Sequence, residues 1–164
     1  MKKAAIGIGS NQGDSVRICL DAIEGLRNHP AINILLASSL YRTKPVGVTG
    51  QEWYINAAVL CETSLAPPEL LDFLLGLEKS FGRVRTVKWG PRTLDLDILF
   101  YEDLKLDIPG LTVPHPLMHE RLFVLAPLAE IDPDWIHPGV GLSVREMLDR
   151  LKLSDHQQEI FKME

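Results

Sequence analysis

The segment from residue 94 to residue 101 constrains the fold of this chain more than any other. Its apolar residues alternate with Asp95 and Asp97, which is typical of a β-strand with one buried face. The side chains expected in the core are Leu94, Leu96, Ile98 and Phe100. Asp95 and Asp97 then share the opposite face, with Cα atoms roughly 6.5–7 Å apart. Two carboxylates this close repel unless a cation lies between them, and Mg²⁺ is often held by one or two carboxylates, phosphate oxygens and water. Alternatively, the two aspartates bind no metal and simply form the solvent-exposed face of the strand.

A basic cluster precedes these aspartates in a chain whose formal net charge is -5. Its members are Arg83, Arg85, Lys88 and Arg92. Gly82, Gly90 and Pro91 interrupt the segment, so we expect a loop that can close over a ligand. Proteins that bind nucleic acid usually have a basic balance over the whole domain. A local cluster on an acidic chain indicates a smaller polyanion such as a nucleoside triphosphate, with a solvated run of charges as the alternative.

The hydrophobic pattern predicts the element order β-α-β-β-α-β. The residues expected in strands are 3–9, 32–40, 53–62 and 94–101, and those expected in helices are 14–29 and 67–81. This order predicts an α+β fold, a ferredoxin-like sandwich in which helices pack on one face of an antiparallel sheet. Extra C-terminal helices are expected over residues 117–130 and after the capping box formed by Ser143 and Glu146.

The remaining segments are expected to lack regular structure. Loops are predicted for residues 44–51 and 109–116, which are rich in proline and glycine. The polar tail after Ser154 is expected to be frayed. The length of 164 residues fits one domain, residues 1–164.

Two other patterns do not carry their usual function here. Gly7, Gly9 and Gly13 follow a predicted strand, but their spacing is one residue too long for a dinucleotide-binding fingerprint. His115 and His119 are four residues apart without the glutamate of a zinc-binding helix, and prolines flank His115. We therefore expect neither a dinucleotide-binding turn nor a zinc site.

The chain is expected to act in the cytoplasm. It has no apolar run near the roughly 18–20 residues of a membrane-spanning helix, and its N-terminal apolar stretch is shorter than a signal-peptide core. Cys19 and Cys61 are its two cysteines, and their apolar surroundings indicate buried, reduced thiols.

A specific motif covers residues 90–99, which read Gly-Pro-Arg-Thr-Leu-Asp-Leu-Asp-Ile-Leu. Further segments that match in order are residues 8–14, 39–47, 54–58, 82–85 and 111–115, together with Glu78, Arg121 and Phe123. In these segments the chain resembles the 6-hydroxymethyl-7,8-dihydropterin pyrophosphokinases of folate biosynthesis. The resemblance implies a ferredoxin-like fold. It also implies transfer of the pyrophosphoryl group of ATP to the hydroxyl of the pterin, with AMP and the pterin diphosphate as products.

The resemblance further implies the residues of the site. Asp95 and Asp97 would hold two Mg²⁺ ions. The residues implied in catalysis are Arg92, Asp95, Asp97, Lys88 and Arg85. Those implied in ATP binding are Glu78, Arg83, Arg85, Lys88, Trp89, Arg92, Ile98, Thr112, His115 and Arg121. Those implied in pterin binding are Thr43, Pro45, Val46, Gly47, Tyr54, Asn56, Trp89, Asp95 and Phe123. Tyr54 and Phe123 would stack on the two faces of the pterin, and Asn56 would bond its edge.

Two alternatives and two departures from the family pattern remain. A nucleotide-binding regulatory module of ferredoxin-like fold would share the sheet and the basic loop, but it has no need for Asp95 and Asp97 behind Arg92. An RNA-binding domain would show exposed aromatic residues and a basic balance, so no nucleic-acid partner is expected.

Gly110 and Pro116 stand where some relatives have an arginine and an aromatic residue, so any nucleotide contact from those two side chains is missing here. We expect the chain to act as a monomer.

Overall fold

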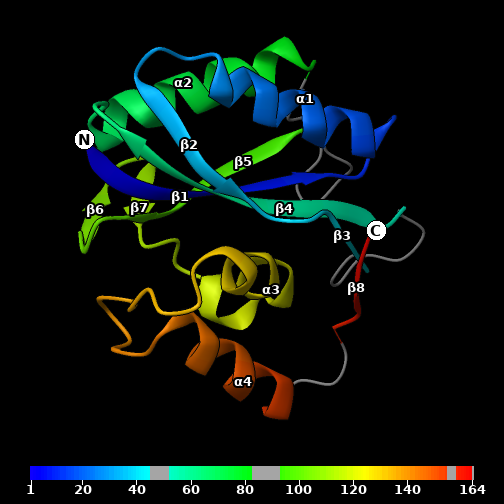
Figure 1. Ribbon diagram of the computed structural model, residues 1–164, viewed down its shortest axis with the longest axis vertical. Helices are drawn as coiled ribbons and strands as arrows, with labels where there is room; N and C mark the ends of the chain where they lie inside the picture. The colour runs from blue at the N-terminus through cyan, green and yellow to red at the C-terminus, as the bar shows by residue number, and fades with distance from the viewer. Residues whose placement is uncertain (45–51, 83–92, 155–157, 164) are drawn as a thin grey trace.

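An antiparallel sheet lies between two layers of helices (Figure 1). The computed structural model describes residues 1–44, 52–82, 93–154 and 158–163. The strands of the main sheet are β1 (Lys2–Ser10), β2 (Ile32–Ala37), β3 (Tyr41–Thr43), β4 (Tyr54–Thr63), β5 (Asp95–Tyr101) and β8 (Ile160–Lys162). Over the described residues their order is β5-β1-β4-β3-β8, and β2 also pairs with β4. The long strands β1 and β4 are therefore central, as the predicted ferredoxin-like arrangement requires.

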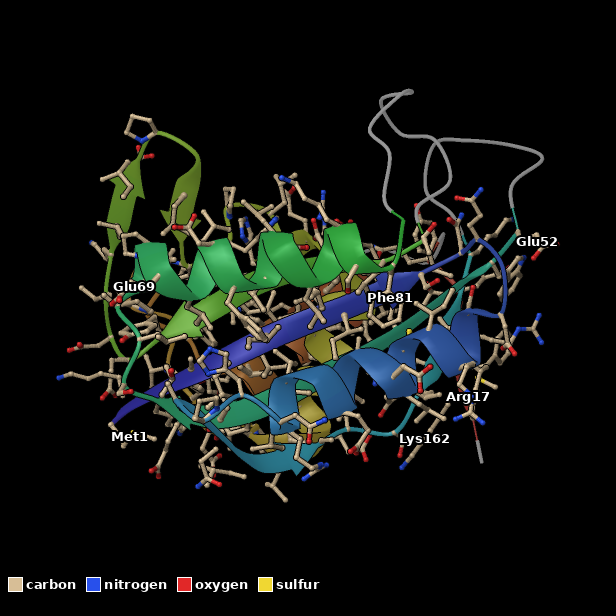
Figure 2. The ribbon with its side chains drawn as sticks, turned by 90° about the horizontal axis from the view of Figure 1, so that it is seen from above. Met1, Arg17, Glu52, Glu69, Phe81 and Lys162 are labelled. Atoms are coloured by element: carbon tan, nitrogen blue, oxygen red, sulfur yellow. The ribbon has the colours of Figure 1, made fainter. Side chains whose placement is uncertain are left out.

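Two helices cover one face of this sheet, and Figure 2 shows both lying over the strands. They are α1 (Ser15–Arg27) and α2 (Pro67–Ser80). The predicted cap of α1 is confirmed, because the Asp14 side chain accepts a hydrogen bond from the Arg17 amide at 3.2 Å. Buried side chains of both helices meet one face of β1, β4 and β5 in the larger of two apolar clusters. The elements follow the predicted β-α-β-β-α-β order with one additional short strand, β3, between β2 and β4.

The opposite face of the sheet is covered by the C-terminal helices (Figure 1). These are a short 3-10 helix η1 (Met118–Glu120), α3 (Leu122–Ile131) and α4 (Val144–Ser154). The predicted capping box at the start of α4 is present, since Ser143 and Glu146 exchange hydrogen bonds of 3.1 Å. Leu125, Leu128 and Leu151 pack with residues of the sheet in a second cluster. None of the helices in the described ranges is long and apolar enough to cross a membrane.

Phe100 is buried, but on the face opposite to the one predicted. The pairing of β1 with β5 shifts its register between Ala5 and Ile6, which leaves one extra residue on β5. Leu99 and Phe100 consequently both belong to the cluster under α3 and α4. There Phe100 stacks on Trp135 with ring centroids 4.7 Å apart.

Three segments differ from the prediction because of pairing with distant parts of the chain. The predicted strand 32–40 ends early, at Ala37 in β2, and the separate short strand β3 follows it beyond the predicted range; the two pair with successive parts of β4. The predicted loop 109–116 includes β7 (Leu111–Val113), which forms a hairpin with β6 (Leu106–Ile108). The tail ends in β8, which pairs with β3 instead of fraying.

Candidate active site

The two aspartates of β5 lie on the same face of the sheet, as their alternation predicts. Asp95 pairs with Gly9 and Asp97 pairs with Gly7 of β1. Successive side chains of a strand alternate between faces, so both carboxylates share the face of Leu99, which packs under α3 and α4. Both residues are half-buried. The carboxylates therefore lie beside the C-terminal helices, away from α1 and α2.

The buried side-chain amide of Asn56 lies in line with Asp95 across the sheet. Gly9 pairs with Asp95 on one side and with Asn56 of β4 on the other. The Asn56 side chain is 7% exposed, and its Oδ1 accepts a hydrogen bond of 2.6 Å from the Thr43 hydroxyl. A Cβ atom on Gly9 would lie 2.9 Å from Nδ2 of Asn56. The glycine thus leaves room for the amide, and the fold brings Thr43, Asn56 and the half-buried Tyr54 together with Asp95.

His115 approaches the aspartates from the segment after β7. Its backbone amide donates to the carbonyl of Leu99 at 3.1 Å, and its Nε2 lies 4.0 Å from Oδ1 of Asp97. Nδ1 of the imidazole accepts a hydrogen bond of 3.4 Å from the Leu117 amide. A neutral ring that accepts at Nδ1 carries its proton on Nε2. The Nε2–H group is therefore the donor on the side of Asp97.

The charge state of His115 follows from its surroundings. Burial lowers its pKa below the ordinary value, and the positive charge of Arg121 lowers the pKa further, against an opposing effect of Asp95. The imidazole is thus neutral at pH 7. Arg121 lies between η1 and α3, with its guanidinium carbon 5.5 Å from the ring centroid of Phe123. The predicted phosphate-contacting residues His115 and Arg121 are close enough to influence each other.

Glu78 has a role that the sequence did not indicate. Its side chain is 2% exposed, and Oε2 accepts a hydrogen bond of 2.7 Å from the amide of Leu96, between the two aspartates. The carboxylate therefore anchors the start of β5 to α2. A sequence signal for its burial was available, because Glu78 continues the spacing of four that Leu70 and Leu74 begin on α2.

The other predicted residues are more dispersed. Ile98 is buried in the cluster under α1 and α2 at 4% exposure, so its side chain faces away from the aspartates. Thr112 lies on β7, where its hydroxyl donates to Asp107 at 3.2 Å.

Several predicted site residues lie outside the described residues. They are Pro45, Val46, Gly47, Arg83, Arg85, Lys88, Trp89 and Arg92. Glu52 and Phe81, which are described and precede or follow two of these segments by one or two residues, lie toward the same end of the molecule (Figure 2).

The donor set fits magnesium better than a metal enclosed by protein ligands. In the part of the chain that the structure describes, no group of three or more His, Cys, Asp or Glu residues could hold a metal ion. Asp95 and Asp97 supply two carboxylates on one face. Mg²⁺ in phosphate-transferring sites is commonly bound by one or two carboxylates and completed by substrate phosphates and water. The residues present fit this arrangement.

The sequence matches known proteins over most of its length. The family model of 7,8-dihydro-6-hydroxymethylpterin-pyrophosphokinase matches residues 5–133. This chain belongs to that family. It is 44% identical over 151 residues to the 2-amino-4-hydroxy-6-hydroxymethyldihydropteridine pyrophosphokinase of Methylorubrum extorquens, covering 92% of this chain and 94% of the relative. The enzyme of the same name from Bacillus subtilis is 48% identical over 128 residues, covering 78% of this chain and 77% of the relative.

Solved structures confirm the fold. The crystal structure of wild-type Plasmodium falciparum HPPK-DHPS with pteroate matches 91% of this chain with a TM-score of 0.74 and 14% sequence identity. A structure of HPPK-DHPS in complex with substrates matches 93% of this chain, also with a TM-score of 0.74. This chain covers 42% and 44% of those two longer chains. The likeness establishes the ferredoxin-like fold of the family.

Proposed function

We propose that this chain carries out the reaction of its family on the face of the sheet that bears Asp95, Asp97 and His115. In that reaction the pyrophosphoryl group of ATP is transferred to the hydroxyl of 6-hydroxymethyl-7,8-dihydropterin, as a step of folate biosynthesis. AMP and the pterin diphosphate are the products. The main evidence for this site is the pair of half-buried carboxylates on one strand face, with Nε2 of His115 4.0 Å from Oδ1 of Asp97.

The triphosphate would bind at the aspartates. Asp95 and Asp97 would hold two Mg²⁺ ions, which neutralise phosphate charge and make the β-phosphorus more electrophilic when they are bound. His115 would donate from Nε2 to a phosphate oxygen, and Arg121 would add a positive charge on the same side. The basic cluster at residues 83–92 would surround the rest of the triphosphate, and Thr112 would lie toward the nucleoside. The implied contact of Glu78 with ATP is not part of this proposal, because its carboxylate is buried against the Leu96 amide.

The pterin would bind beside Asn56. The hydroxyl of Thr43 fixes the orientation of this amide by donating to Oδ1, so that the amide meets the edge of the pterin without rotating. Tyr54 and Phe123 would stack on the two faces of the ring. This arrangement would place the substrate hydroxyl next to Asp95, which pairs with Gly9 in the same row as Asn56.

Proton abstraction by a protein side chain is not part of this proposal. Because Nδ1 of His115 accepts the Leu117 amide, Nε2 acts as a donor and is not available as a base. Catalysis would rest on positioning of the two substrates and on stabilisation of developing charge, as in other phosphoryl transfers.

The experiment is an assay of Asp95→Asn and Asp97→Asn with ATP, Mg²⁺ and the hydroxymethyl dihydropterin, in which nucleotides are separated by chromatography. Loss of either carboxylate should lower turnover by at least about 100-fold while the fold survives. Asp103→Asn is the matched control, since Asp103 is an exposed aspartate in the turn that follows β5. Near wild-type turnover of either variant at saturating Mg²⁺ would refute the site. Stoichiometric ADP in place of AMP would refute pyrophosphoryl transfer.

We also propose that the chain works in the cytoplasm. Cys19 and Cys61 are free and buried. Burial raises the pKa of the Cys19 thiol to about 12, and burial followed by the charge of Glu62 raises that of Cys61 to about 11. Such thiols are unreactive and suit a reducing compartment.

A further inference from the structure

The C-terminal residues 158–163 form the outer edge of the sheet next to the proposed pterin site. In Figure 1, β8 runs beside β3 at the end of the chain. Ile160 pairs with Thr43, and the amide of Lys44 donates to the carbonyl of Glu159 at 3.1 Å. This segment is therefore fixed by backbone hydrogen bonds to the strand that carries Thr43.

The first residue of this segment reaches a second part of the proposed site. Oε1 of Gln158 accepts a hydrogen bond of 2.8 Å from the amide of Leu122, and Nε2 donates to the carbonyl of Glu120 at 3.0 Å. These two backbone groups lie immediately on either side of Arg121. Gln158 also lies outside residues 5–133, the part matched by the family model.

Helix α3 depends on this distant side chain for its N-terminus. Arg121 is the N-cap residue, and its side chain makes no capping hydrogen bond. The first amides of a helix have no partner within the helix, and Gln158 accepts from the first of them, on Leu122. The backbone of Arg121 is extended, with φ of -119° and ψ of 108°. Its own amide donates to Met118 and its carbonyl accepts from Val124 and Leu125, and Gln158 binds the two neighbouring groups, the Glu120 carbonyl and the Leu122 amide.

We infer that Gln158 is a positioning residue that fixes Arg121 and Phe123 relative to Thr43. The inference rests on the proposed function, which assigns Arg121 to phosphate and Phe123 to the pterin. The side-chain amide of Gln158 binds both peptide groups that flank Arg121. The strand that follows Gln158, β8, is fixed to β3. The distance between the two halves of the proposed site is thereby set by the C-terminal segment.

The chemistry of this contact requires glutamine. The side chain must offer one donor and one acceptor from the same planar group. Glutamate at position 158 would keep the acceptor for Leu122 but would place a carboxylate against the Glu120 carbonyl, and asparagine is one methylene shorter. Gln158→Met keeps the approximate size of the side chain and removes both hydrogen bonds.

The first test compares kcat/KM of the wild-type chain with that of Gln158→Met. We expect a decrease of about tenfold or more, because small displacements of positioning groups are costly in transfer reactions. Ser143→Ala is the matched control. It removes the hydrogen bond to the Glu146 amide that caps α4, so it destabilises a helix N-terminus without touching Arg121. Its kcat/KM should stay within about twofold of the wild type. If Gln158→Met does not fold, Gln158→Glu replaces it, with the same expected direction.

A double-mutant cycle with Arg121→Ala separates positioning from general destabilisation. Because Gln158 is inferred to act through Arg121 as well as Phe123, Gln158→Met should lower kcat/KM by a clearly smaller factor in the Arg121→Ala background than in the wild type. An equal cost in both backgrounds, an unchanged kcat/KM, or equal losses in Gln158→Met and Ser143→Ala would each overturn the inference. Failure of the proposed function would be seen separately, as ADP in place of AMP from the wild type or as near wild-type turnover of Asp97→Asn.

Discussion

Substitution of Gly9 by alanine would test the row formed by Asp95, Gly9 and Asn56. The new Cβ atom would lie 2.9 Å from Nδ2 of Asn56, a separation that requires one of the two groups to move. The amide is not free to rotate, because Thr43 donates to its Oδ1 at 2.6 Å in a buried environment. We therefore expect the amide to shift and its hydrogen bond to weaken.

The size of the effect follows from these contacts. A buried polar group that loses its hydrogen bond costs about 1–3 kcal/mol, and alanine returns about 0.4–1 kcal/mol by restricting the unfolded chain. The free energy of unfolding should fall by about 1–2 kcal/mol, which for 164 residues lowers Tm by about 2–8 °C. Because Asn56 is proposed to bond the pterin edge, KM for the pterin should rise about tenfold, the equivalent of one misplaced hydrogen bond.

The assay is steady-state kinetics at saturating ATP, together with thermal unfolding. Gly7→Ala is the control, since the nearest atoms to a Cβ there belong to Leu99, at 3.3 Å and beyond, and not to Asn56. Its KM for the pterin should change by less than about twofold. If Gly9→Ala and Gly7→Ala gave the same KM, the argument that Gly9 makes room for the Asn56 amide would be refuted.

Two predictions concern carboxylates outside the reaction centre. Glu78→Ala should lower the free energy of unfolding by about 2–4 kcal/mol in denaturant titrations, because it leaves a cavity and an unpaired Leu96 amide; an effect near zero would contradict the anchoring role. Burial would raise the pKa of Glu130, but hydrogen bonds from Tyr41 and Ser39 outweigh burial and hold the pKa below its ordinary value of 4.5. The stability from these bonds is present above that value and lost as pH falls through the folded pKa. The excess Tm of the wild type over Glu130→Gln should therefore shrink in acid, and a constant difference from pH 7 to pH 3 would show that the carboxylate is not responsible.

The sequence by itself determined the features that depend on near neighbours. The alternation around Asp95 and Asp97 specified a strand with both carboxylates on one face, because side-chain direction in a strand is fixed by a period of two. Asp14 and Ser143 marked helix starts, because a cap binds an amide only two or three residues away. The single-domain organisation and the monomeric state stay predictions.

Only the tertiary structure decided which distant segments meet. A register shift in the pairing with β1 turned Phe100 toward the second core, and nothing near Phe100 in the sequence signals that shift. Glu78 bonds an amide 18 residues away, and Gln158 bonds an amide 36 residues away. In the sequence each is a polar residue whose partner is unknown. Their roles arise because packing of α2 and pairing of β8 bring them to unsatisfied backbone groups, and such groups are costly to bury without a partner.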